Sequence, residues 1–159
     1  FIYMPTSGIV QGMRPLMSYN YGAKLKERMH QILKVSGLVI AAILGAGTLL
    51  FFIVPNVLLS LFNASSGMLE IGETGLRILS LSFIVSSFGV LMSGVFEALG
   101  LGKYSLIVSL LRQLLITVPL AYILLNIMGI EGIWLSFVIA EAIASIVAYI
   151  LYRKKFKTI

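Results

Sequence analysis

The sequence has 159 residues, of which 59% are hydrophobic and only 11% charged, and its mean hydropathy is +1.04. Soluble domains average about 25% charged residues, so this composition excludes an ordinary soluble domain. The net charge of +6 comes from too few charges for a nucleic-acid-binding face, and the absence of cysteine excludes disulfides and thiolate chemistry. We therefore expect an all-α fold, a polytopic bundle of transmembrane helices.

The first segment, 1–18, is predicted to be the end of a transmembrane helix that starts outside this sequence. Its uncharged part, 1–13, is too short to cross a bilayer, which takes roughly 20 apolar residues. It lacks the basic leading region and cleavage site of a signal peptide, and position 1 is not methionine. We interpret the sequence as a fragment. Residues 19–34 then form a basic loop whose apolar spacing also fits an amphipathic helix at the membrane surface.

Four later stretches are long and apolar enough to cross a 30 Å hydrocarbon core at about 1.5 Å per residue. We predict transmembrane helices over 35–54, 78–97, 104–128 and 133–152. The segments between and after them are an extracytoplasmic loop with a short interfacial helix, a cytoplasmic turn, an extracytoplasmic turn and a basic tail: 55–77, with its helix over 57–62 and a turn over 63–67, then 98–103, 129–132 and 153–159.

The basic residues are distributed unevenly between the two sides of the predicted membrane. If the loop 20–34 is cytoplasmic, four crossings return the C-terminus to the cytoplasm. That side then holds nine lysines and arginines: Lys24, Lys26, Arg28, Lys34, Lys103, Arg153, Lys154, Lys155 and Lys157. The opposite side holds Arg77 with three glutamates. Because lysine and arginine collect on the cytoplasmic side, we predict a cytoplasmic C-terminus.

Small residues recur at every fourth position within the predicted spans, which favours close helix packing over contact with lipid. The rows are Gly37, Ala41 and Gly45; Ser82 and Ser86; Gly89 and Ser93; and Ser136, Ala140, Ala144 and Ala148.

Two charged residues lie near the middle of neighbouring predicted spans. An arginine or glutamate there costs about 2.5–3.5 kcal/mol and normally faces a partner or a water-filled cavity. Arg112 and Glu141 lie about 13 Å and about 16 Å from the cytoplasmic ends of their helices, so they share a depth. We predict that they pair, or share a polar cavity with Gln113. Both a purely structural ion pair and a site on a transport pathway remain open.

Glu97 and Pro119 are candidates for a gate or a kink. Glu97 ends its span at the cytoplasmic side and fits either an exposed carboxylate or a gating group. Pro119 leaves the Leu115 carbonyl without its helical partner, and Thr117 is close enough to help satisfy polar groups there. We find no catalytic constellation and no metal site, since His30 has only Glu27 near it, and we do not expect an enzyme.

Residues 12–24, GMRPLMSYNYGAK, resemble the signature loop in the second half of MATE transporters, a Gly-x-x-Pro followed by Tyr-Asn-Tyr-Gly-Ala. The matching positions are Gly12, Pro15, Asn20, Tyr21, Gly22 and Ala23. Further matches follow in the family's order: Ala98-x-Gly100, Arg112-Gln113 before Pro119, and Gly129-x-x-Gly132-Ile-Trp134.

The resemblance implies the C-terminal part of a twelve-helix exporter in a bacterial cell (inner) membrane. Such a protein exports lipophilic organic cations in exchange for sodium ions or protons, by alternating access and without another cofactor. Its implied partners are the cationic small molecules, membrane lipid and the N-terminal half of the same transporter, with no nucleic acid. The family's ion-coupling carboxylates lie largely in helices outside this sequence, and many relatives carry glutamine where Glu97 stands, so we transfer no ion-binding residue.

Two other functions remain open: a lipid-linked oligosaccharide flippase of the same superfamily, and a membrane scaffold that transports nothing. Flippases of anionic head groups usually need several cavity-facing basic residues, and the predicted spans contain only Arg112. The cost of placing Arg112 and Glu141 in the bilayer argues against a scaffold, unless the pair is purely structural.

Overall fold

The structure, a computed structural model, describes residues 2–61 and 65–156. Within these ranges every regular element is helical, as predicted for the fold class. The elements are α1 (Tyr3–Gly22), α2 (Lys26–Ile53), α3 (Pro55–Ser60), α4 (Ser66–Ala98), α5 (Gly102–Leu110), the π-helical turn η1 (Leu111–Leu115), α6 (Thr117–Met128) and α7 (Ile130–Phe156).

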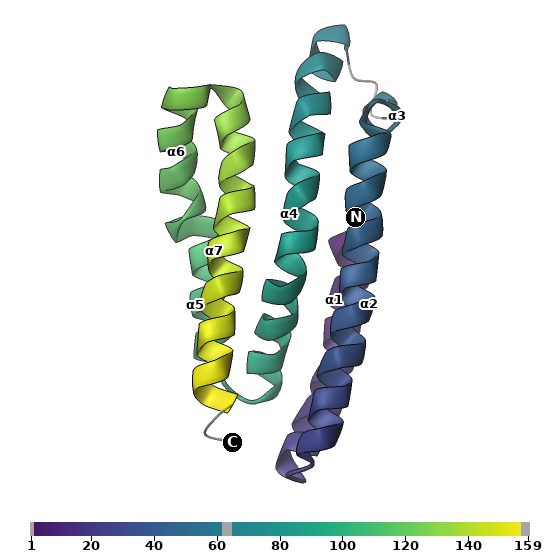
Figure 1. The fold of residues 1–159 in the computed structure, drawn as a ribbon, viewed down its shortest axis with the longest axis vertical. Helices are drawn as coiled ribbons and strands as arrows, with labels where there is room; N and C mark the ends of the chain where they lie inside the picture. The colour runs from purple at the N-terminus through teal and green to yellow at the C-terminus, as the bar shows by residue number, and fades with distance from the viewer. Residues whose placement is uncertain (1, 62–64, 157–159) are drawn as a thin grey trace.

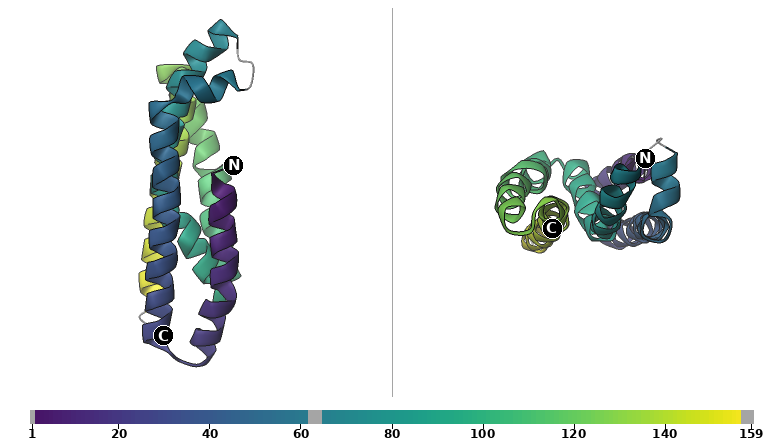
Figure 2. Two further views of the ribbon diagram at one scale, coloured as in Figure 1. Left: turned by 90° about the vertical axis from the view of Figure 1, so that its right-hand side faces the viewer. Right: turned by 90° about the horizontal axis from the view of Figure 1, so that it is seen from above.

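The long helices run side by side, up and down the bundle (Figure 1). The α1–α2 turn, the α4–α5 turn and the end of α7 lie together at one end, which we call the basic end because it carries Lys24, Lys26, Lys103, Arg153, Lys154 and Lys155. Figure 2 shows that α1 covers only the half of the bundle nearest the basic end. Among the described residues, four stretches are long and apolar enough to cross a membrane: Lys26–Ile53, Gly67–Ala98, Gly102–Met128 and Ile130–Lys155.

Proline and glycine set two of the helix boundaries. Pro55 lacks a backbone N–H and disfavours the helical conformation in the residue before it, so α2 ends at Ile53 and Val54 is not helical (φ −123°, ψ 45°). Gly129 takes a positive φ of 69° between α6 and α7, a conformation in which glycine meets no steric penalty. The connection predicted over 129–132 is therefore shorter, because α7 already begins at Ile130.

Helix α4 differs most from its predicted bounds. It begins at Ser66, so most of the predicted loop 55–77 is helical, with α3 at Pro55–Ser60 near the interfacial helix expected over 57–62. The charges that we used to end the span lie within α4, where Arg77 donates to Glu73 at 2.7 Å, one helical turn away. Such pairs stabilise a helix that extends beyond the bilayer. Residues 62–64, part of the predicted interfacial helix and turn, lie outside the described residues.

The remaining boundaries shift by a few residues. Helix α1 continues to Gly22 rather than ending at 18, and α2 begins at Lys26, so the predicted loop 19–34 is reduced to 23–25. The turn predicted over 98–103 occupies 99–101, and α7 extends through 153–156 of the predicted tail. Residues 157–159 are not among those described. In each case the helix continues past the apolar stretch, because charged residues end a membrane span without ending a helix.

The predicted small-residue row on α7 is buried. Ser136, Ala140, Ala144 and Ala148 each have a relative exposure of 0%, and on α4 Ser82 and Ser86 are also buried. Gly37 and Gly89 likewise approach neighbouring helices, since an added Cβ would lie 2.9 Å from Leu91 Cδ2 and 3.2 Å from Ser145 Oγ. These contacts confirm that the small residues meet other helices.

Gly132 gives a test of the α6–α7 packing. A Cβ on this residue would clash with the carbonyl oxygen of Leu124, a backbone atom that cannot rotate away. We expect Gly132→Ala to destabilise the protein by about 1–3 kcal/mol, because the two helices must separate. Thermal unfolding in detergent would measure the change. Gly102→Ala is the control, since nothing lies within 4 Å of its Cβ position. An unchanged melting temperature for Gly132→Ala would show that the hairpin packs more loosely.

Candidate functional site

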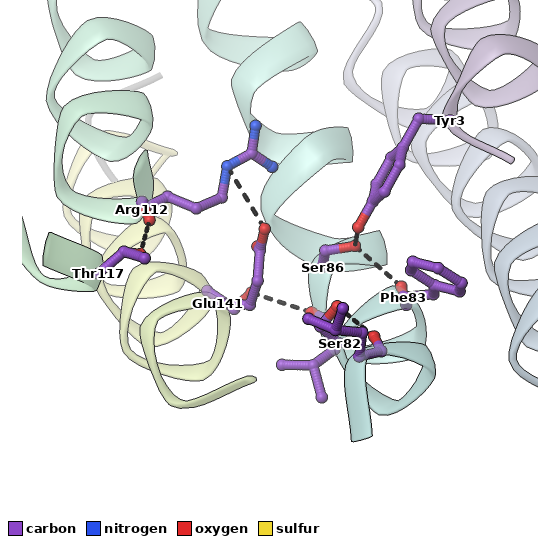
Figure 3. Close-up of polar contacts among 10 residues, drawn as sticks. Tyr3, Ser82, Phe83, Ser86, Arg112, Thr117 and Glu141 are labelled. Carbon is purple, nitrogen blue, oxygen red and sulfur yellow. Dashed lines mark hydrogen bonds and ion pairs between the residues drawn. The ribbon is translucent and has the colours of Figure 1, made fainter. Parts of the chain in front are cut away.

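A π-helical turn interrupts the helix that carries Arg112. The Ile116 N–H donates to the Leu111 carbonyl at 3.0 Å, five residues back instead of four. The Arg112 carbonyl, which an α-helix would pair with Ile116, accepts a hydrogen bond from Thr117 Oγ1 instead (Figure 3). Pro119 follows within one turn and has no N–H to donate. The distortion therefore lies before Pro119, over 111–115, and π-turns of this kind are frequent at functional sites.

Arg112 and Glu141 face one another from η1 and α7 (Figure 3). Arg112 Nε lies 3.7 Å from Glu141 Oε1, and the two side chains are only 19% and 15% exposed. The contact involves one nitrogen and one oxygen, so it lacks the two parallel hydrogen bonds of the strongest arginine–carboxylate pairs. Within the described part of the chain, Glu141 Oε2 is buried and accepts no hydrogen bond. One carboxylate oxygen is thus left for another partner.

This pair lines a cavity of about 560 Å³ between α1, α4, η1 and α7. Aromatic and hydroxyl side chains form the wall facing the pair. Tyr3 donates to or accepts from Ser86 Oγ at 2.9 Å, and its ring meets Phe83 edge-on with centroids 5.7 Å apart (Figure 3). The lining residues are Tyr3, Ser7, Leu76, Leu79, Ser82, Phe83, Val90, Arg112, Gln113, Phe137 and Glu141. Gln113 thus lies beside the ion pair.

A second cavity, of about 280 Å³, adjoins the first toward the basic end, and Ser7, Val90 and Arg112 line both. Its charged residues are Arg14 of α1 and Glu97 of α4, which form an ion pair. Ser105 of α5 donates to Glu97 Oε1 at 2.7 Å, so the Glu97 carboxylate joins three helices. The Arg14 and Glu97 side chains remain 41% and 36% exposed.

Sequence reasoning missed Arg14 and so missed the partner of Glu97. The two residues are far apart in the sequence and lie on helices that are not consecutive, so spacing along the chain does not relate them. The available signal was depth. Arg14 lies eight residues before the end of α1 at Gly22, or about 12 Å along the helix, where an arginine requires a partner.

The residues of the resemblance in α1 form a turn and line neither of the two cavities. Gly12 and Pro15 lie within α1, and Asn20 is buried with its Nδ2 donating to the Leu16 carbonyl at 2.8 Å. The Leu25 N–H donates to the Asn20 carbonyl at 2.9 Å, and Tyr21, Gly22 and Ala23 continue the same turn into α2. In this chain these residues therefore shape the α1–α2 connection.

Comparison with known proteins relates the chain to one group of membrane proteins. The MatE family matches residues 1–123. Multidrug export protein MepA of Staphylococcus saprophyticus is 26% identical over 144 residues, which is 91% of this chain and 32% of that protein. MepA of Staphylococcus aureus strain N315 matches with the same identity and coverage. The chain thus spans about a third of the length of these relatives.

Solved structures give the same relation. The MATE multidrug transporter DinF-BH, solved in complex with a drug-like ligand, is 31% identical, with a TM-score of 0.88 over 97% of this chain and 34% of its own. A multidrug resistance MATE family transporter in its inward-facing conformation has a TM-score of 0.92 at 22% identity, over 99% of this chain and 37% of its own. Its outward-facing conformation gives 0.90, also at 22% identity and over 99% of this chain, and covers 36% of its own. At 22% identity these two show the shared fold.

Proposed function

Because this chain belongs to the MatE family of membrane transporters, we propose that it forms part of the C-terminal half of a bacterial multidrug exporter. Such a protein lies in the cell (inner) membrane, and the charge of the basic end favours a cytoplasmic C-terminus. The remaining helices, including the N-terminal half, would complete the walls of the two cavities.

The proposed substrates are lipophilic organic cations. The observation that carries this proposal is the larger cavity, in which the buried Glu141 carboxylate faces the rings of Tyr3 and Phe83. Aromatic rings attract cations through their faces, and a carboxylate with a free oxygen supplies an opposite charge. Both cavity arginines, Arg14 and Arg112, are already paired with glutamates. This charge balance favours cations over the anionic head groups that a flippase would carry.

We further propose that export is coupled to sodium ions or protons through Glu141. A coupling ion that neutralises the carboxylate would remove its attraction for a cationic drug, so ion and drug would displace one another. The two cavities meet at Arg112, which places the ion pair between the two compartments that alternating access would open in turn. The π-turn before Pro119 supplies a bend at the same level, and the Glu97 contacts form the proposed gate at the basic end.

Efflux of a fluorescent lipophilic cation from cells that express the complete reading frame tests the proposal. The sodium and proton gradients are collapsed separately. We expect efflux to stop when one gradient is lost, which names the coupling ion. Good expression with no efflux under either gradient would overturn the exporter and favour a flippase, with Arg112 as the next residue to test.

A further inference from the structure

A third cavity lies on a face of the bundle that the two polar cavities do not reach. It is a groove between α4 and α7 of about 320 Å³, lined by Phe88, Ser145, Ile146 and Tyr149. None of these residues lines either polar cavity. On the same face of α7, Ile146 and Ile150 are 59% and 57% exposed. Exposed isoleucines on a membrane-spanning helix indicate a surface in contact with lipid or with another helix.

The shape of the groove follows from how closely the two helices approach one another. Ser145 Oγ donates to the Val85 carbonyl at 3.0 Å, and a Cβ on Gly89 would lie 3.2 Å from that oxygen. The close contact leaves Phe88 and Tyr149 as the walls, with ring centroids 6.0 Å apart. Because the hydroxyl of Ser145 already has its hydrogen bond, the groove presents an apolar floor.

A positive charge stands at the end of the groove nearest the basic end. Arg153 lies one helical turn beyond Tyr149, and its Cζ is 5.8 Å from the centre of the Tyr149 ring. Among the described residues, no carboxylate pairs with Arg153. Lys154 and Lys155 follow directly. An apolar groove at membrane depth therefore leads to a guanidinium without a counter-ion.

We propose that this groove binds an anionic phospholipid, with one acyl chain against Phe88, Ile146 and Tyr149 and the phosphate against Arg153. The flat guanidinium matches the oxygens of a phosphate diester in two parallel hydrogen bonds. Basic sites between transmembrane helices near the membrane surface recognise anionic head groups in this way. The inference goes beyond drug export, because it concerns the lipid-facing side of the bundle and none of the residues in the proposed transport cavities.

Native mass spectrometry of the protein from the complete reading frame, purified in detergent, measures this binding directly. Phosphatidylglycerol and phosphatidylcholine of identical chains are the two probes, and we expect retention of phosphatidylglycerol. Arg153→Gln removes one charge beside the groove and should lower the bound fraction about fivefold. Ile146→Trp fills the groove and should lower it as well.

Each variant has a matched control. Lys155→Gln removes the same charge at the same end, but Lys155 Nζ lies over the ring of Tyr104 on α5, away from the groove. Ile150→Trp adds the same ring to an exposed position of α7 that does not line the groove. We expect both controls to retain the lipid.

Three results would overturn the proposal. Equal retention of phosphatidylcholine would remove the role of charge. An equal loss in Arg153→Gln and Lys155→Gln would reduce the site to general attraction by the basic end. Displacement of the lipid by millimolar glycerol phosphate would indicate a site for a free anion. Because the readout is binding, a failure here is distinguishable from a failure of the efflux experiment.

Discussion

Glu141→Gln is expected to lower efflux about 10- to 100-fold while the protein still reaches the membrane. Hydrogen bonds and ion pairs of a charged group in such a site contribute about 1.5–3 kcal/mol, which corresponds to this range. The substitution keeps the shape of the side chain and removes the charge that would hold a drug cation or a coupling ion. Initial rates of dye efflux, divided by the amount of protein in the membrane, measure the effect.

Two further variants separate transport from stability. Glu131→Gln changes an exposed glutamate in the first turn of the same helix and should transport normally. Arg112→Gln with Glu141→Gln removes both charges, which relieves the cost of leaving Arg112 buried without its partner. If the pair only joins two helices, the double variant recovers efflux. If Glu141 binds the transported cation or the coupling ion, the double variant folds but remains inactive.

The second large effect is expected from linking α1 to α4 at the Arg14–Glu97 ion pair. The chain contains no cysteine, so Arg14→Cys/Glu97→Cys introduces a pair of thiols without competition from this sequence. A short bifunctional thiol reagent should stop efflux, and its reductive cleavage should restore efflux to the level before treatment. The reason is that a gate at the basic end must open once in each cycle.

The matched control places both thiols on one helix. Glu73→Cys/Arg77→Cys replaces the ion pair within α4, and the same reagent should leave efflux unchanged there, since the two residues belong to one rigid element. Complete linkage of positions 14 and 97 with full efflux would mean that this end stays closed throughout. Glu97 would then serve to hold α1, α4 and α5 together.

The two ion pairs show what the sequence could and could not predict about the site. Arg112 and Glu141 lie on consecutive helices joined by a short turn, so counting residues from the helix ends placed them at one depth. Their contact at 3.7 Å agrees with that count, while their role in transport remains a prediction. Arg14 and Glu97 lie on α1 and α4, and the packing of those two helices depends on contacts distributed over the whole core.

Helix bounds were less predictable than helix number. The apolar pattern records where the bilayer lies, whereas a helix continues for as long as its backbone hydrogen bonds are satisfied. Helix α4 therefore runs through Glu73 and Arg77 to Ser66. In the same way, Pro119 indicated a bend but not its position, because the backbone accommodates a missing N–H by rearranging the preceding turn over 111–115.

That rearranged turn also divides the third span into two differently phased halves. A π-turn takes up one more residue than an α-turn, and one residue corresponds to about 100° of rotation around the helix. Residues after 115 therefore point in directions that an uninterrupted helix would have given to their neighbours. Deleting a single residue within 111–115 would straighten the segment and rotate α6 as a unit, exchanging its lipid-facing side chains for inward-facing ones. A comparison of this span with related helices must therefore allow a one-residue offset at this point.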